Sequence, residues 1–411
     1  IEESKKLKLA DIEPPVITYE EKKQIEDRGK PAITAYELYA RGLTLLDTDP
    51  NGALDFFKQA VKIDNTYVEA LKEAGYTAGY KLDLFQEALE YLDRADTVLK
   101  QREETLTTGY ADLMYNIGDV YLRKGNSESA MAYFITSKTI RDRLEIRTTS
   151  AYADLMVKIG TLYDNKTDLV SAMEHYMTGK TIMDSLGLQK NSRYADLMIN
   201  IGAVYDSKGD PDSAMEYYIK GKTILESLDL QKTASYAVLI NNIGGVCWSR
   251  GDTAGAMKYY LESQSIKESL ELQKTSGYAG LMMNIGIVYF IKGDLESAKE
   301  YYMKCKTILD SLELRKTSIY ADLMMNTGII YVRKGDFESA MEYYMKCKTI
   351  LDNLMFQKTS GYANLMTNFG IVSNKKGDLS GALEYYVKSK SIMDSLELQK
   401  TSSYSGLMMN F

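Results

Sequence analysis

Asparagine side chains recur along this chain at a spacing that could serve peptide recognition. They lie 42 residues apart, or 84 where Lys158 interrupts the column: Asn116, Asn200, Asn242, Asn284, Asn326, Asn368 and Asn410. A carboxamide has one acceptor and two donor hydrogens, so a row of them can bond an extended peptide backbone whatever its sequence. Asparagine is a mediocre helix former, so its repetition needs a reason. Two other reasons stay open: polar residues tied to neighbouring turns, or copying during duplication of the repeats.

The remaining titratable residues do not assemble into a catalytic or metal site. Aspartates recur at multiples of the same spacing, namely Asp112, Asp154, Asp196 and Asp322. Equivalent residues on packed helices lie roughly 8–10 Å apart, too far to share a proton, so a column of like charge is the better interpretation. His175 is the only histidine, which argues against a histidine triad or a multi-histidine metal site. Asp47–Gly52 imitates a calcium loop, but Lys58 stands at its twelfth position. We therefore expect no enzyme activity, no metal and no cofactor.

Lysines form a further column in the second half of each unit. Its members are Lys138, Lys180, Lys222, Lys306, Lys348 and Lys390. Two interpretations remain open. The lysines form either a solvated face near a helix C-terminus, where the helix dipole favours cations, or a basic docking stripe.

A tyrosine that returns every 42 residues predicts the elements that carry these columns. It stands at Tyr110, Tyr152, Tyr194, Tyr236, Tyr278, Tyr320, Tyr362 and Tyr404. A period of roughly 20–50 residues is the signature of a solenoid. In one unit, we expect Ser276 to cap a first helix that ends at Gly293, and Asp294 to cap a second helix. Each unit is thus expected to be a helical hairpin.

Small residues predict how closely the two helices of a hairpin approach. A glycine stands eight residues after the tyrosine in each unit from Gly118 to Gly370. An alanine stands twenty residues after the tyrosine, and an aromatic residue four further on. A mid-helix glycine costs about 0.5–1 kcal/mol against alanine, so its repetition indicates close packing against the second helix.

This order of small and aromatic residues resembles the tetratricopeptide (TPR) pattern. The 42-residue spacing resembles that of kinesin light chain and of asparagine-ladder TPR adaptors. The resemblance implies an all-α fold, a right-handed TPR superhelical solenoid of stacked antiparallel helix hairpins. We expect residues 1–30 to be a charged linker or capping arm and residues 31–105 to be two divergent hairpins. Residues 106–411 are expected to hold seven 42-residue repeats and the start of an eighth, in one continuous solenoid.

The resemblance also implies that the first helices line a concave groove, where the asparagines hold a ligand's backbone. Under this interpretation the groove is acidic in the N-terminal half, at Asp112, Asp154 and Asp196. It then becomes apolar along a strip formed by Trp248, Met283, Ile287, Phe290, Ile329 and Val332. A helix face that turns apolar suggests a contact surface, and the alternative is packing between neighbouring first helices. We expect a peptide ligand with a basic flank and apolar anchors.

Composition limits the partners and the location. A net charge of −7 argues against a nucleic-acid partner. No apolar run approaches the length of a membrane span. Three cysteines make no disulfide framework, which favours a reducing, cytoplasmic compartment. The chain starts at Ile1 and stops at Phe411 inside an expected helix, so we expect further sequence at both ends, with any targeting signals there.

The function that we expect from the sequence is a non-enzymatic protein–protein interaction adaptor. The alternative is a structural subunit embedded permanently in a larger complex, with its groove filled by a neighbouring subunit. The identity of the ligand and the oligomeric state stay open.

Overall fold

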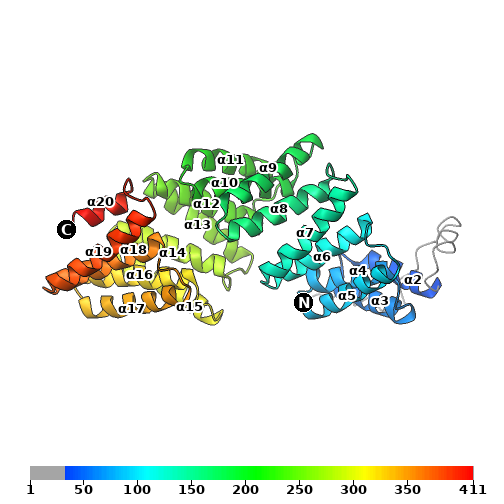
Figure 1. Cartoon of the computed structure of the whole chain (residues 1–411), viewed down its shortest axis with the longest axis horizontal. Helices are drawn as coiled ribbons and strands as arrows, with labels where there is room; N and C mark the ends of the chain where they lie inside the picture. The colour runs from blue at the N-terminus through cyan, green and yellow to red at the C-terminus, as the bar shows by residue number, and fades with distance from the viewer. Residues whose placement is uncertain (1–32, 411) are drawn as a thin grey trace. The chain divides into compact units, whose positions relative to one another are not determined.

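Helices make up all the regular secondary structure in the computed structural model, which describes residues 33–410 (Figure 1). The contacts divide the chain into two compact units, Ile1–Lys190 and Asn191–Phe411. The charged arm expected at residues 1–30 lies outside the described range. Across that range, no helix combines the length and the apolar character needed to cross a membrane.

The first unit consists of hairpins that are consecutive along the chain. Its elements are α2 (Ile33–Leu45), α3 (Pro50–Ile63), α4 (Val68–Tyr76), the π-helical turn η2 (Thr77–Lys81), α5 (Phe85–Gln101), α6 (Thr108–Arg123), α7 (Ser127–Arg143), α8 (Ser150–Asn165) and α9 (Leu169–Ser185). Each odd-numbered helix packs most extensively against the helix before it, as α7 does against α6.

The second unit repeats the same pairing. Its helices are α10 (Ser192–Ser207), α11 (Pro211–Ser227), α12 (Ala234–Ser249), α13 (Thr253–Ser269), α14 (Ser276–Ile291), α15 (Leu295–Ser311), α16 (Ser318–Lys334), α17 (Phe337–Asn353), α18 (Ser360–Lys375), α19 (Leu379–Ser395) and α20 (Ser402–Met408). Even-numbered helices are the first helices of their hairpins and odd-numbered helices are the second. The all-α solenoid of stacked hairpins expected from the sequence is confirmed.

Local side-chain bonds fix where each helix begins and ends. The hydroxyl of Thr275 accepts from the backbone N–H of Tyr278 over 3.2 Å, so Thr275 caps α14 and Ser276 is its first helical residue, one position from the expected cap. Gly293 follows the helix with φ +83°, the left-handed conformation that glycine adopts without strain. Asp294 accepts from the N–H of Ser297 over 3.0 Å and caps α15, as expected.

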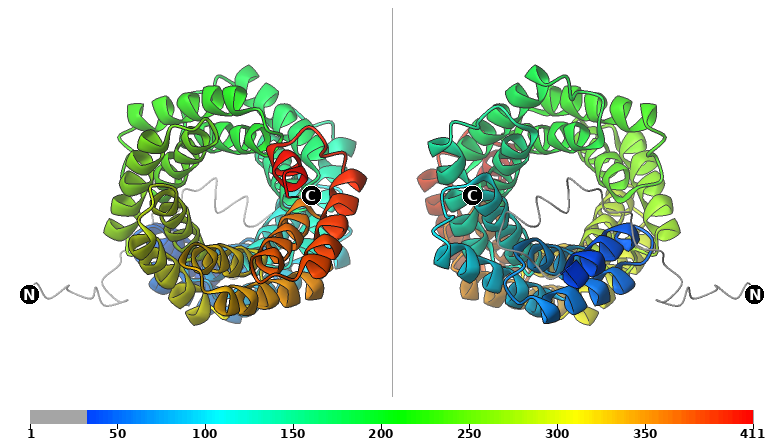
Figure 2. Two further views of the ribbon diagram at one scale, coloured as in Figure 1. Left: turned by 90° about the vertical axis from the view of Figure 1, so that its left-hand side faces the viewer. Right: turned by 90° about the vertical axis from the view of Figure 1, so that its right-hand side faces the viewer.

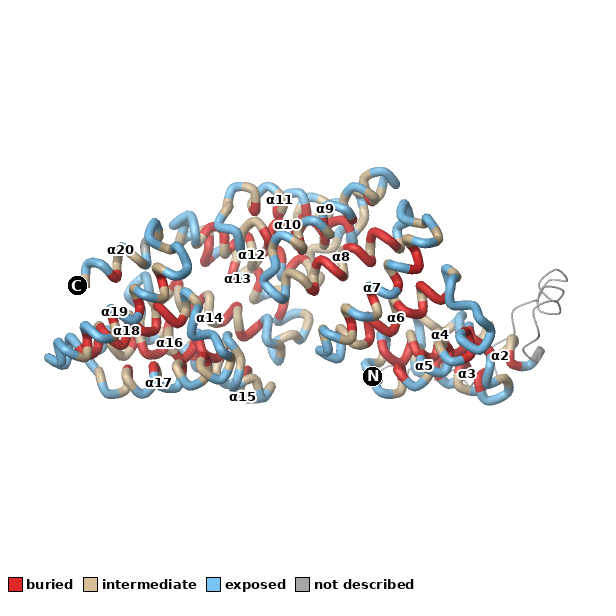
Figure 3. Tube along the Cα trace, viewed as in Figure 1, coloured by how far each residue is buried: buried red, intermediate tan, exposed pale blue. Residues whose placement is uncertain are grey.

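Each hairpin of the 42-residue array is held together where a glycine of the first helix faces an aromatic ring of the second. A Cβ added to Gly286 would lie 2.5 Å from the ring of Tyr302, so only glycine permits this approach. Ala298, one turn before Tyr302, is fully buried. Figure 3 shows buried positions recurring along the helices of each hairpin. The predicted close packing of glycine against the aromatic ring is confirmed.

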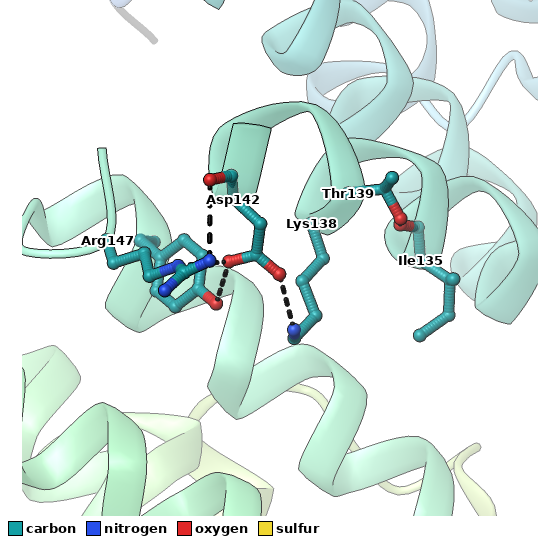
Figure 4. Close-up of polar contacts among 6 residues, drawn as sticks. Ile135, Lys138, Thr139, Asp142 and Arg147 are labelled. Carbon is teal, nitrogen blue, oxygen red and sulfur yellow. Dashed lines mark hydrogen bonds and ion pairs between the residues drawn. The ribbon is translucent and has the colours of Figure 1, made fainter. Parts of the chain in front are cut away.

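Successive hairpins are joined by the repeated tyrosine. In Figure 4, Asp142 of α7 binds Lys138 Nζ over 2.7 Å and Arg147 Nε over 2.8 Å. The hydroxyl of Tyr152, on the next first helix α8, donates to the same carboxylate over 2.7 Å. The same tyrosine-to-carboxylate bond recurs in the second unit at Tyr236–Glu226, Tyr278–Glu268 and Tyr320–Asp310.

These bonds correct both interpretations of the lysine column. Lysines pair with the acidic residue four positions later at Lys138–Asp142, Lys180–Asp184, Lys222–Glu226, Lys306–Asp310, Lys348–Asp352 and Lys390–Asp394. All six are half-buried. They therefore neutralise the carboxylates to which the next repeat's tyrosine binds, and form neither a solvated face nor a free docking stripe.

Candidate functional site

The first helices of the second unit lie closer to one another than the second helices do. Among its non-consecutive helices, the pairs with the most extensive contact are α10–α12, α14–α16 and α16–α18, all first helices. In Figure 1, α11 lies above α10, and α15 and α17 lie below α14 and α16. The end-on views of Figure 2 show the helices of this unit, green to red, in an inner and an outer layer. We call the surface shared by α10, α12, α14, α16 and α18 the first-helix face.

The predicted asparagines are all half-buried, and most keep free hydrogen-bonding groups. Four of their side chains form no hydrogen bond within residues 33–410: Asn116 in the first unit, and Asn200, Asn326 and Asn368 in the second. Asn284 Nδ2 donates to Asn241 Oδ1 over 3.4 Å, and Asn241 Nδ2 donates to Asn242 Oδ1 over 3.4 Å. These two bonds are long, so they tie the amides only weakly.

Lys158 departs from the asparagine column for a structural reason. Its Nζ lies 2.6 Å from Oδ1 of Asp119, a buried residue of the preceding first helix α6. A buried carboxylate is costly unless it is paired, so this lysine stabilises the contact between α6 and α8. The signal in the sequence was the coincidence of a lone aspartate and a lone lysine in adjacent units.

Three of the four predicted aspartates interact with other groups of the protein: Asp112, Asp154 and Asp196. The fourth, Asp322 of α16, forms no side-chain hydrogen bond or ion pair among residues 33–410. Asp112 Oδ1 lies 2.5 Å from Nη2 of Arg141, whose side chain is 3% exposed. Asp196 accepts a hydrogen bond from Ser235, and burial nevertheless raises the pKa of Asp196. Asp154 is half-buried in α8. Of these three, only Asp196 belongs to the second unit.

The predicted apolar strip is half-buried throughout. Trp248, Met283, Ile287, Phe290, Ile329 and Val332 all pack against the core of the second unit and keep part of their surface exposed. The sequence left open a contact surface or packing between first helices, and both interpretations stay predictions. The guanidinium of Arg333 lies 5.6 Å from the centroid of the Phe290 ring, a contact that the sequence did not predict.

Comparison with known protein families matches three segments of the chain. Models described as tetratricopeptide repeat match residues 278–353, and separately residues 111–142 and 195–224. None of the curated protein sequences matches the chain.

Solved structures share the fold at low sequence identity. A Rap protein complexed with Competence and Sporulation Factor has a TM-score of 0.60 and 14% identity, covering 89% of this chain and 99% of that chain. The Rap conjugation gene regulator of the plasmid pLS20, in complex with the Phr* peptide, has a TM-score of 0.57 and 13% identity, covering 89% and 97%. A putative kinesin light chain of Podosopora anserina, with nearly identical TPR-like repeats, has a TM-score of 0.42 and 11% identity, covering 50% and 97%. The matched segments coincide with hairpins of the 42-residue array, so the chain contains tetratricopeptide repeats at these residues.

Proposed function

We propose that the chain is a non-enzymatic protein–protein interaction adaptor that binds an extended peptide segment on the first-helix face of the second unit. The observation that carries the proposal is the set of unpaired amides at Asn200, Asn326 and Asn368, which lie on α10, α16 and α18 of the first-helix face. The half-buried apolar strip lies on α12, α14 and α16 of the same face. A free carboxamide can bond a backbone carbonyl oxygen and a backbone N–H at once. Half-buried apolar residues can then receive every second side chain of the same extended segment.

The structural neighbours favour a peptide over other classes of ligand. Two of them are described as complexes, one with Competence and Sporulation Factor and one with the Phr* peptide. They share only the fold with this chain. In the first unit, peptide binding stays a prediction for the corresponding residues Asn116, Asp112 and Asp154.

The expected energetics rank the contributions of the residues. A micromolar ligand binds with about −8 kcal/mol. Losing one amide that bonds the backbone costs roughly 0.5–1.5 kcal/mol. Losing a central aromatic anchor costs about 2 kcal/mol or more. Trp248→Ala should therefore weaken binding more than Asn326→Ala.

The test is affinity selection from a randomised twelve-residue peptide library, followed by fluorescence anisotropy with the peptides selected. The variants are Trp248→Ala and the double change Asn326→Ala with Asn368→Ala. Glu342→Gln, on the second helix α17 with its side chain 66% exposed, is the matched control. We expect the first two to weaken binding without loss of helical circular dichroism, and the control to bind normally. Failure to select any peptide, or equal affinity of all variants, rejects the proposal.

A second candidate function, a structural subunit of a permanent complex, is favoured by one observation. An aliphatic residue is 43–53% exposed at the same position of every second helix in this unit: Ile219, Leu261, Met303, Met345 and Val387. A repeated exposed apolar column is a feature of interaction surfaces. A permanently buried column should make the isolated protein self-associate. Sedimentation velocity that shows a concentration-independent monomer would exclude this second candidate.

A further inference from the structure

An unpaired carboxylate lies at one end of the first-helix face. Asp206, in the last turn of α10, is half-buried and forms no side-chain hydrogen bond or ion pair within residues 33–410. Burial raises the pKa of this carboxyl group. The negative pole of the α10 dipole lies at the same helix end and also disfavours the carboxylate. Asp206 is therefore a charged group whose environment lacks the cation that would stabilise it.

The surroundings of Asp206 suit a cationic group. Trp248 occupies the equivalent position on α12, which contacts α10 directly. One turn earlier on the two helices, Ala203 and Gly245 stand where the later repeats have isoleucine. A Cβ added to Gly245 would meet only the Tyr260 hydroxyl, at 4.0 Å, so the surface beside the indole is open. A carboxylate on the helix beside a half-buried indole offers both an ion pair and a cation–π contact.

Unpaired cations lie at the other end of the same face. Arg333, in the last turn of α16, is exposed, and its contact is the Phe290 ring. Lys375 holds the equivalent position on α18 and has no ion-pair partner in the described part of the protein. Neighbouring basic residues at these helix ends are paired, as Lys334 is with Glu296 at 2.6 Å. At the ends of α16 and α18, Arg333 and Lys375 are therefore the basic residues without a carboxylate partner among residues 33–410.

We propose that the bound peptide carries a basic residue that contacts Asp206 and Trp248 and an acidic residue that contacts Arg333. This inference rests on the proposed function and adds the charge pattern and the direction of the ligand. Three repeat steps separate α10 from α16, and helix packing places each step at roughly 8–10 Å. At about 3.3 Å per residue, an extended peptide crosses that distance in roughly seven to nine residues. The residues between the two charges contact the apolar strip.

The same peptide selection tests this charge pattern when it is repeated with single-charge variants. The wild-type protein should enrich peptides with Arg or Lys and Asp or Glu seven to nine positions apart, in one order only. Asp206→Asn should abolish the enrichment of basic residues in the selected peptides and keep the enrichment of acidic residues. Arg333→Gln should abolish the enrichment of acidic residues and keep that of basic residues. Asp212→Asn is the matched control because its side chain, on the second helix α11, is 90% exposed. It should leave both preferences intact.

A double-mutant cycle with one selected peptide locates the contact. Replacing the peptide's arginine with neutral citrulline should weaken binding to the wild-type protein about tenfold, the size expected for one charge-assisted hydrogen bond. The same replacement should change nothing with Asp206→Asn, because the contact is already lost. If selected peptides require Trp248 but show no paired charges, the inference is wrong and the proposed function stands. If no peptide is selected, both fall together.

Discussion

The bond between the repeated tyrosine and the preceding carboxylate makes a sharp stability prediction. Tyr278 of α14 donates to Glu268 Oε1 of α13 over 2.6 Å, and the tyrosine is 6% exposed. Tyr278→Phe keeps the buried ring and removes only the hydroxyl. Glu268 then retains one protein donor, Gln264 Nε2 at 2.8 Å. A hydrogen bond to a charged group contributes about 1.5–3 kcal/mol. Because Glu268 is exposed, water replaces part of the lost hydrogen bond. We therefore expect Tyr278→Phe to lower the free energy of unfolding by about 1 kcal/mol.

The destabilisation caused by Tyr278→Phe should depend on pH at both the acidic and the basic end of the range, and the sign is defined at each end. The hydrogen bond from Tyr278 is the largest cause of the lowered pKa of Glu268. A lowered carboxyl pKa stabilises the fold above the unfolded value of about 4.3, and this contribution is lost as the pH falls through the folded value. Burial, followed by the bond to Glu268, raises the pKa of Tyr278. That contribution is complete below about pH 10 and is lost as the pH rises through the folded value.

The assay is thermal unfolding followed by circular dichroism, across the pH range, with Tyr289→Phe as the control. Tyr289 lies on the same helix, and its hydroxyl forms no hydrogen bond within residues 33–410. At pH 7 we expect Tyr278→Phe to lower the midpoint by about 2–4 °C, the shift for 1 kcal/mol in a unit of this size. The difference from wild type should shrink below pH 4 and above pH 10. Equal effects of the two variants, or a difference independent of pH, would refute the role assigned to this bond.

Two further perturbations test the packing. Gly286→Ala puts a Cβ 2.5 Å from the Tyr302 ring and should destabilise the unit by about 1–3 kcal/mol. Gly280→Ala, whose Cβ would first meet Ile319 at 3.6 Å, should instead stabilise the unit by about 0.5–1 kcal/mol. Chemical denaturation of both variants checks the contrast. Lys267 is 6% exposed and its amine bonds only a carbonyl, so Lys267→Met should raise the unfolding midpoint at pH 7. Because burial lowers the pKa of Lys267, that gain should diminish as the pH approaches 10, and a constant gain would show that charge is not its cause.

Hairpins and their packing were predictable because each depends on few residues close in sequence. Asp294 and Gly293 act within their own turn, and the contact between Gly286 and Tyr302 joins two helices of one hairpin. The cap was misplaced by one residue because Thr275 and Ser276 both have capping hydroxyls, and sequence alone does not choose between them. Contacts between repeats were harder to predict from the sequence, because they depend on the directions of side chains on different hairpins.

The lysine column and the cations of the first-helix face show that difficulty. Lys306 looked free in the sequence, but it binds Asp310, which also accepts from the tyrosine of the next repeat. Arg333 was missed because the adjacent Lys334 is equally basic. Only the structure shows that Lys334 pairs with Glu296 while Arg333 lies over the ring of Phe290. A charged residue without an ion-pair partner and a charged residue that is already paired look the same in sequence.

The repetition helps to separate the residues that maintain the array from those that we propose contact a partner. Residues repeated in every unit, such as Gly286 and Tyr278, have partners within the protein that explain the repetition. The position that holds Asp206 changes to Trp248 and then to Phe290 in successive repeats, so its side chain is not dictated by the hairpin. The asparagines recur in every 42-residue repeat except the one that holds Lys158, yet most have no intramolecular partner among residues 33–410. We propose that the partner of these amides is the backbone of a peptide, because a peptide backbone is equally regular.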